Sequence, residues 1–190
     1  MLVMLKAHTL PSGEEVMVPD RYVRASDFDD RLGQANNPEW KTVALAGDGR
    51  VVVPQGAIGF RWGADGRADA GQWNLEAKEA ARGADVKLTL SLLDDATAAS
   101  RTAQIGFPYF GGIESEHFPN NAQGDVLVRT VPVQRIALGA EGQTALVATV
   151  FDLQVANYGV ARGLSGELAA KDFDDDTPYT PAWQERITGT

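Results

Sequence analysis

The sequence contains no cysteine at all. Without thiols the chain can form no disulfide, no iron–sulfur cluster and no thiolate zinc site. This fits a reducing compartment, in which disulfides are rare. Histidine is almost as scarce, because only His8 and His117 occur and neither has a second histidine at a ligand spacing. The residues therefore predict no metal centre of the histidine and cysteine type.

Several common signatures of enzymes and membrane proteins are also missing. There is no G-x-G-x-x-G or G-x-x-x-x-G-K-[ST] loop to hold a phosphate, and no G-x-S-x-G turn of a serine hydrolase. The N-terminal stretch lacks the apolar region and small-residue cleavage site of a signal peptide, and no apolar run approaches membrane-spanning length. The sequence thus indicates neither a self-contained hydrolase nor a transmembrane helix.

Positive charge is in short supply. The chain has 17 lysines and arginines against 26 acidic residues, a net charge of −9 and a pI near 4.7. No cluster of basic residues forms the stripe that follows a phosphate backbone. We therefore expect neither nucleic acid nor an anionic membrane surface as a partner, and the charge mainly favours solubility.

What the sequence does contain is an ordinary globular composition of 190 residues, 44% of them hydrophobic. This length suits one domain, or a domain with an extension, and can bury a core without disulfides. Twenty glycines and nine prolines indicate many turns and few long helices. The predicted fold class is α+β, a β-rich mixed domain with several short strands, few short helices and long loops.

Strands are predicted wherever β-branched and aromatic residues alternate with polar ones. A hairpin is the clearest of them, with Lys41–Ala46 and Arg50–Pro54 joined by the turn Gly47–Gly49. Pro132 predicts a bulge or an edge position within Val126–Leu138. The other expected strands are Met1–Leu5, Glu15–Pro19, Ala57–Trp62, Val86–Leu93 and Ala145–Phe151.

Helix signals are few and local. Thr180 followed by Pro181 is a good N-cap and first-turn pair for a helix through Trp183 and Ile187. Further helices are predicted at Ser26–Leu32, ending at Gly33, and at Asp152–Val160, with acidic residues in their first turns. Gln72–Ala81 has moderate helical character with a mixed polar face.

Two groups of acidic residues are candidate cation sites. Glu114, Ser115, Glu116 and His117 offer oxygen and nitrogen ligands, but an exposed acidic loop is the favoured interpretation of this group. The acidic segment Asp172–Asp176, with Asp172, Asp174, Asp175 and Asp176, lacks the spacing of a calcium-binding EF-hand loop. A solvated turn before a helix is the expected role of this second group.

The aromatic residues suggest packing more than catalysis. Phe107–Gly112 is predicted to form an aromatic turn, including Phe107, Pro108, Tyr109 and Phe110. It could line a sugar or ligand site, but core packing or an interface with another part of the protein is favoured. The four tryptophans are expected to be buried packing anchors: Trp40, Trp62, Trp73 and Trp183.

Several short stretches resemble, in order, the alpha subunit of bacterial respiratory nitrate reductases, of the molybdopterin oxidoreductase superfamily. The similarity runs from about residue 30 to the C-terminal end. It is carried by Asn37–Ala44 (NPEWKTVA), Ile58–Gly63 (IGFRWG), Trp73–Leu75 (WNL), Gly106–Gly112 (GFPYFGG), His117–Phe118, Thr149–Leu153 (TVFDL), Ala156–Gly159 (ANYG), Arg162–Leu164 (RGL) and Tyr179–Gly189 (YTPAWQERITG).

This resemblance implies a far longer parent enzyme that reduces nitrate to nitrite. The family's alpha subunit binds molybdenum in two molybdopterin guanine dinucleotides and holds a [4Fe–4S] cluster. Its electrons come from quinol through an iron–sulfur beta subunit and a membrane gamma subunit, on the cytoplasmic face of the cell membrane. In the family, the cluster ligands and the molybdenum-binding aspartate lie upstream of this segment, so no catalytic, cofactor-binding or metal-binding residue is carried over.

The resemblance and the missing motifs together predict an internal structural domain that packs against the remainder of the alpha subunit. Residues 1–190 are expected to be one segment, with 1–30 and 164–190 peripheral or extended. The segment alone is expected to bind no cofactor and to be inactive. Two alternatives remain: a standalone binding module that uses the aromatic turn 107–110, and a metal-binding domain that uses one of the acidic groups.

Overall fold

The computed structural model describes residues 1–10, 12–58, 75–94, 101–108, 126–139, 141–167, 169–175 and 180–189. The chain divides into two compact units. The first contains residues 1–2, 22–89 and 137–143, and the second contains residues 3–21, 90–136 and 144–190. Each unit therefore combines segments that lie far apart in the sequence.

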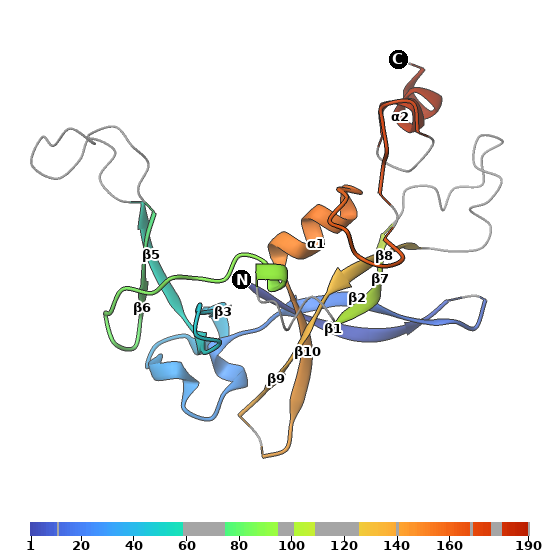
Figure 1. The fold of residues 1–190 in the computed structure, drawn as a ribbon. Helices are drawn as coiled ribbons and strands as arrows, with labels where there is room; N and C mark the ends of the chain where they lie inside the picture. The colour runs from blue at the N-terminus through green and yellow to red at the C-terminus, as the bar shows by residue number, and fades with distance from the viewer. Residues whose placement is uncertain are drawn as a thin grey trace, which may run out of the picture. The chain divides into compact units, whose positions relative to one another are not determined.

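A six-stranded mixed sheet forms the body of the second unit (Figure 1). Its order is β8-β7-β2-β1-β10-β9, with β2 parallel to β7 and β7 antiparallel to β8. The strands are β1 (Leu2–Thr9), β2 (Glu15–Tyr22), β7 (Thr102–Pro108), β8 (Val126–Pro132), β9 (Gln134–Ala137) and β10 (Thr144–Thr149). The predicted strands at residues 1–5, 15–19 and 126–138 are confirmed, and β8, which ends at Pro132, is an edge strand as expected.

The core of this unit lies between one face of the sheet and the helix α1 (Val150–Asn157). Alternate residues of each strand point into it because successive side chains of a strand face opposite sides. The core members are Val3, Leu5, Ile105, Phe107, Val131, Val133, Ala148, Leu153 and Ala156. The predicted strand at 145–151 is therefore confirmed as β10, but the last two residues already belong to the helix.

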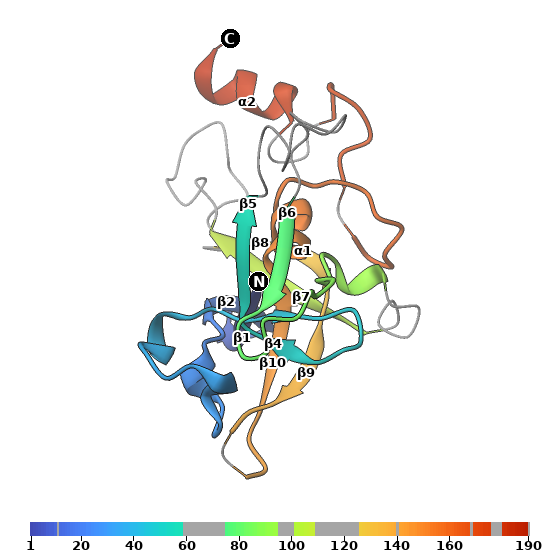
Figure 2. The ribbon, with the colours of Figure 1, turned by 90° about the vertical axis from the view of Figure 1, so that its left-hand side faces the viewer.

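The first unit is built on two short strand pairs (Figure 2). β3 (Ala44–Leu45) pairs with β4 (Val51–Val52), and β5 (Pro54–Ile58) pairs with β6 (Leu75–Glu79), both antiparallel. The hairpin predicted at residues 41–54 is therefore confirmed. The sequence leaves the stretch 72–81 undecided, and its described residues contain strand β6. The partner strand β5 supplies a hydrogen-bonding edge that outweighs a moderate helix propensity.

The turn of this hairpin is held by its own side chains. Gly49 has a φ of +83°, a conformation that glycine adopts without strain. The Asp48 carboxylate accepts hydrogen bonds from the Arg50 backbone at 3.1 Å and from its Nε at 2.8 Å. The Arg50 side chain thereby holds the pKa of Asp48 below its usual value. Arg50 also reaches the buried Glu79 on β6 at 3.1 Å, so one guanidinium joins the two strand pairs.

Three short 3-10 turns lie at residues 25–40 in the same unit: η1 (Ala25–Asp27), η2 (Arg31–Gly33) and η3 (Pro38–Trp40). The α-helix predicted at Ser26–Leu32 is wrong, because Leu32 has a φ of +48° and the Asp27 side chain bonds back to the Arg24 backbone at 2.8 Å. The strand predicted at Val86–Leu93 is also wrong. It makes a single bridge from Leu88 to Ala46 and ends in the 3-10 turn η5 (Leu92–Asp94).

The second α-helix, α2 (Pro181–Thr188), begins as predicted. The Thr180 hydroxyl accepts a hydrogen bond from the Trp183 backbone at 3.2 Å, and Pro181 occupies the first turn. Among the residues that the structure describes, no helix is both long enough and apolar enough to span a membrane. The β-rich α+β class expected from the sequence is confirmed.

Gly139 should tolerate no side chain. A Cβ there would lie 2.2 Å from the Asp29 nitrogen and 2.6 Å from the Phe28 carbonyl carbon, both backbone atoms. Gly139→Ala should lower the free energy of unfolding by about 1–3 kcal/mol, as overpacking usually does. Gly47→Ala is the matched control, because its Cβ would meet its nearest neighbour at an ordinary 3.5 Å. Equal denaturant midpoints for the two purified variants would contradict this close approach.

Candidate functional site

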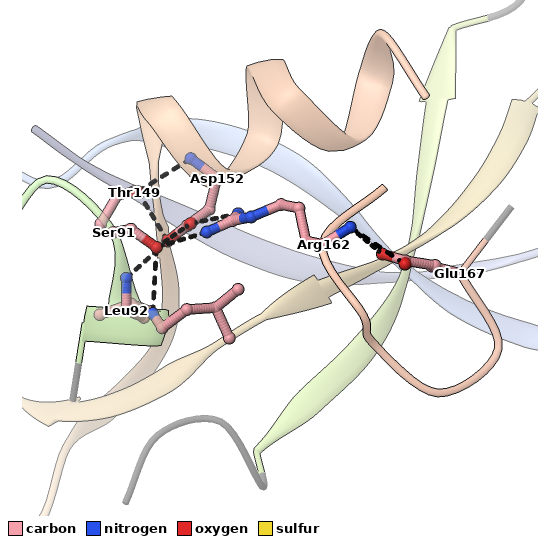
Figure 3. A network of polar contacts seen from close by, with 7 residues as sticks. Ser91, Leu92, Thr149, Asp152, Arg162 and Glu167 are labelled. Carbon is pink, nitrogen blue, oxygen red and sulfur yellow. Dashed lines mark hydrogen bonds and ion pairs between the residues drawn. The ribbon is translucent and has the colours of Figure 1, made fainter. Parts of the chain in front are cut away.

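The Asp152 carboxylate is fully buried, with 0% of the residue exposed. It lies in the first turn of α1 and accepts four hydrogen bonds (Figure 3). Oδ1 accepts from the Ser91 hydroxyl at 2.7 Å and from Arg162 Nη1 at 2.6 Å. Oδ2 accepts from the Leu92 backbone at 2.9 Å and from the Thr149 hydroxyl at 2.8 Å.

The hydroxyl groups around Asp152 are also fully used. Ser91 Oγ donates to Asp152 and accepts from Arg162 Nη2 at 2.5 Å and from the Leu93 backbone at 3.0 Å. Thr149 Oγ1 donates to the carboxylate and accepts from the Asp152 backbone at 3.0 Å. Thr149 is thus the N-cap of α1, and a hydroxyl offers one donor and two acceptor positions. The buried oxygens of both hydroxyls therefore have partners.

The segment from Arg162 to Glu167 completes the network. The Arg162 side chain is largely buried and forms the ion pair with Asp152. Its guanidinium carbon also lies 5.7 Å from the centre of the Phe151 ring, within the range of a cation–π contact. The Glu167 carboxylate accepts from the Arg162 backbone at 3.0 Å and from the Gly163 backbone at 2.7 Å. Arg162 is therefore held twice, by its side chain at Asp152 and by its backbone at Glu167.

These contacts define the Asp152 network: Ser91, Leu92, Thr149, Asp152, Arg162 and Glu167. It joins three separated segments, namely the turn η5, the junction of β10 with α1 and the loop after α1. Four bonds saturate a carboxylate, so Asp152 keeps no lone pair for a metal or a substrate proton. Asp152 therefore has a structural role: it holds the three segments together, since a buried charge requires pairing and complete hydrogen bonding.

The candidate cation sites do not gain support from the described residues. Glu114, Ser115, Glu116 and His117 lie outside them. In the acidic segment, Asp172 accepts from the Asp174 backbone at 3.0 Å and Asp175 from the Lys171 backbone at 3.1 Å. These are turn-forming bonds of exposed side chains. Asp176 lies outside the described residues. His8 is half-buried on β1. No group of three or more potential metal ligands occurs within the described ranges.

The aromatic residues divide into buried and exposed ones. Phe107 is buried in the core on β7, so the prediction that it forms part of a turn is wrong, because its alternation with Ile105 directs it inward. Tyr109–Gly112 lie outside the described residues. Trp183 is buried as expected, whereas Trp40 is 80% exposed and is not the packing anchor that was predicted. The other two tryptophans are likewise outside the described part.

The Asp152 network was not foreseen from the sequence. Asp152 was expected only as an acidic residue at a helix start, although Thr149 three residues before it matches the N-terminal capping pattern in which a hydroxyl and an acid bond reciprocally. That pattern could have placed the start of α1 at Val150. No local signal links Ser91 or Arg162 to Asp152, because they lie 61 and 10 residues away along the chain.

Comparisons with known proteins give consistent matches, although no family model matches the chain. Over 189 residues, its whole length, the chain is 49% identical to the respiratory nitrate reductase 2 alpha chain of Escherichia coli and 47% identical to the respiratory nitrate reductase 1 alpha chain of the same organism. It is 32% identical over 182 residues to the nitrate reductase alpha chain of Bacillus subtilis. The chain spans 14%, 14% and 13% of the lengths of these relatives.

Among the residues that the structure describes, none is assigned to a molybdenum or iron–sulfur group. Such clusters are held by thiolates, and the sequence has no cysteine. The buried carboxylate of Asp152 is already saturated by protein donors. No step of a reaction is therefore assigned to these residues through such a group.

Removing the central carboxylate should destabilise the fold strongly. Asp152→Ala leaves Arg162 Nη1, the Ser91 hydroxyl and the Leu92 backbone without the oxygens that accept from them. Breaking a buried pair in this way costs about 3–5 kcal/mol. Asp174→Ala, at an exposed acid, should change the free energy of unfolding by less than about 0.5 kcal/mol. Chemical denaturation of both purified variants measures the two free energies of unfolding. Equal decreases in the two variants would show that the Asp152 network does not stabilise the fold.

Proposed function

The chain is homologous over its whole length to a segment of the respiratory nitrate reductase alpha chain, and on this premise we propose that it is a structural segment of such a subunit. Its 190 residues form one segment, of which residues 164–190 are peripheral or extended. The expectation of a peripheral position does not extend to all of residues 1–30, because β1 and β2 are the middle strands of the sheet. The segment packs against the remainder of the alpha subunit and stabilises it. The observation that carries this proposal is the saturated Asp152 network, which is built to hold chain segments together and leaves no group free for chemistry.

In this proposal the chemistry belongs to the complete enzyme. The complete subunit reduces nitrate to nitrite at a molybdenum centre with two molybdopterin guanine dinucleotides, assisted by a [4Fe–4S] cluster. Its partners are an iron–sulfur beta subunit and a quinol-oxidising gamma subunit at the cytoplasmic face of the cell membrane. These assignments follow the resemblance to the family. In this proposal the segment itself contacts neither the membrane nor nucleic acid.

The position of network residues supports a scaffold role. Thr149 and Asp152 lie in the string TVFDL and Arg162 opens RGL, two of the strings that carry the family resemblance. Their contacts are made within the chain, so the resemblance at these positions is explained by folding of the segment. A segment of this kind contributes to enzyme function by positioning its neighbours rather than by touching substrate.

The segment on its own should lack nitrate reductase activity. The purified chain, assayed with nitrate and reduced viologen, should form no nitrite. Elemental analysis should find no stoichiometric molybdenum, because the chain has no cysteine thiolate and the Asp152 carboxylate is already fully hydrogen-bonded. The complete alpha subunit, purified in parallel, is the positive control. Nitrite formation by the separate chain would overturn the proposal.

In the complete enzyme, Asp152→Ala should reduce the amount of assembled alpha subunit. Turnover per bound molybdenum and the KM for nitrate should stay within about twofold of wild type, because a positioning segment affects folding more than the transition state. Asp174→Ala serves as the control for loss of an acidic residue. A normal yield of enzyme with lost turnover per molybdenum would place Asp152 in the catalytic machinery and contradict the scaffold role.

A further inference from the structure

The solvent-facing side of α1 carries large apolar side chains. Phe151 is 37% exposed, Tyr158 directly after the helix is 64% exposed, and Val160 is 52% exposed. Phe151 and Tyr158 are seven residues apart, which is about two helical turns, and therefore lie on the same side. We call Phe151, Gln154 and Tyr158 the α1 face. None of these three side chains carries a formal charge, although the chain as a whole has a net charge of −9.

The opposite side of the same helix is already buried. Leu153 and Ala156 pack in the core against the sheet, beside the buried carboxylate of Asp152. The helix therefore lacks the wholly polar outer side of a usual surface helix, because aromatic side chains lie there beside Gln154. Exposed apolar groups gathered on one surface are typical of a site that another protein surface covers.

The α1 face is also held rigidly. The Thr149 cap and the Asp152 bonds fix the start of the helix (Figure 3). The Arg162 guanidinium lies over the Phe151 ring. An aromatic surface that is ordered before binding loses little conformational entropy when a partner covers it. Tyrosine in particular is enriched at protein interfaces, where it combines apolar area with a hydrogen-bonding tip.

We propose that the α1 face is the surface on which the remainder of the alpha-subunit polypeptide packs. This inference rests on the proposed function and adds the surface through which the segment acts. The chain spans 14% of its relatives' length, so most of such a subunit lies outside these residues and is available as the occupant. An uncharged apolar contact is typical of permanent interfaces, which resemble a domain core more than transient interfaces do.

Hydroxyl-radical footprinting with mass spectrometry tests this surface directly. The oxidation rate of Tyr158 is measured in the separate chain and in the complete alpha subunit. It should be at least about fivefold lower in the complete subunit, because residues in an interface core lose most of their solvent contact. An equal rate overturns the proposal. Protection that appears only when the separate chain is concentrated also overturns it, because the occupant would then be a second copy.

A charge placed on the α1 face gives the second measurement. Tyr158→Lys should shift the melting temperature of the separate chain by less than about 2 °C, because the position is exposed there. It should lower the melting temperature of the complete alpha subunit clearly, since a lysine would be buried without a partner. Ser165→Lys, at an exposed position in the loop after α1, is the matched control and should leave both proteins unchanged.

The two proposals fail in different ways. If Asp152→Ala lowers assembly of the complete subunit but Tyr158 stays fully reactive and Tyr158→Lys has no effect, the scaffold role stands and the α1 face is not its interface. If Asp152→Ala leaves assembly normal while Tyr158 is protected, the interface stands without the scaffold role. Both proposals fail together only if Asp152→Ala leaves assembly normal and Tyr158 is not protected in the complete subunit.

Discussion

A single buried carboxylate determines how the second unit is held together. Asp152 has no contact with solvent, so its charge is tolerable only if every acceptor position is filled. Its partners come from a turn, a strand end and a loop, and each of these must be in place for the others to be satisfied. The sheet and α1 share one core, and the residue that binds Ser91 lies in the first turn of that helix.

The parts of the fold that follow from the sequence are those decided by neighbours in the chain. The Gly47–Gly49 turn and the Thr180–Pro181 helix start were predicted because glycine, threonine and proline act on the backbone within a few residues. The sequence alone leaves strand β6 undecided between helix and other structure, and the stretch at residues 86–93 was misassigned, because pairing with distant strands decides their conformation. Local propensity carries little information about such partners.

The site was harder to predict than the fold. A lone aspartate after an apolar strand has no distinguishing pattern, and the Thr149–Asp152 pair indicates a helix cap without indicating a buried ion pair. Trp40 shows the converse difficulty, since a tryptophan is expected inside and this one is exposed in the described structure. Composition predicts the average location of a residue type, whereas burial of one side chain depends on tertiary packing.

The junction of β10 and α1 has no connecting residues, because Thr149 ends the strand and Val150 begins the helix. Each residue inserted there would rotate the helix by about 100° around its axis. One insertion would turn Leu153 away from the sheet and Asp152 away from Ser91 at the same time. Insertions and deletions during evolution are thus expected in the loops of this segment. The number of residues between β10 and α1 is expected to stay unchanged.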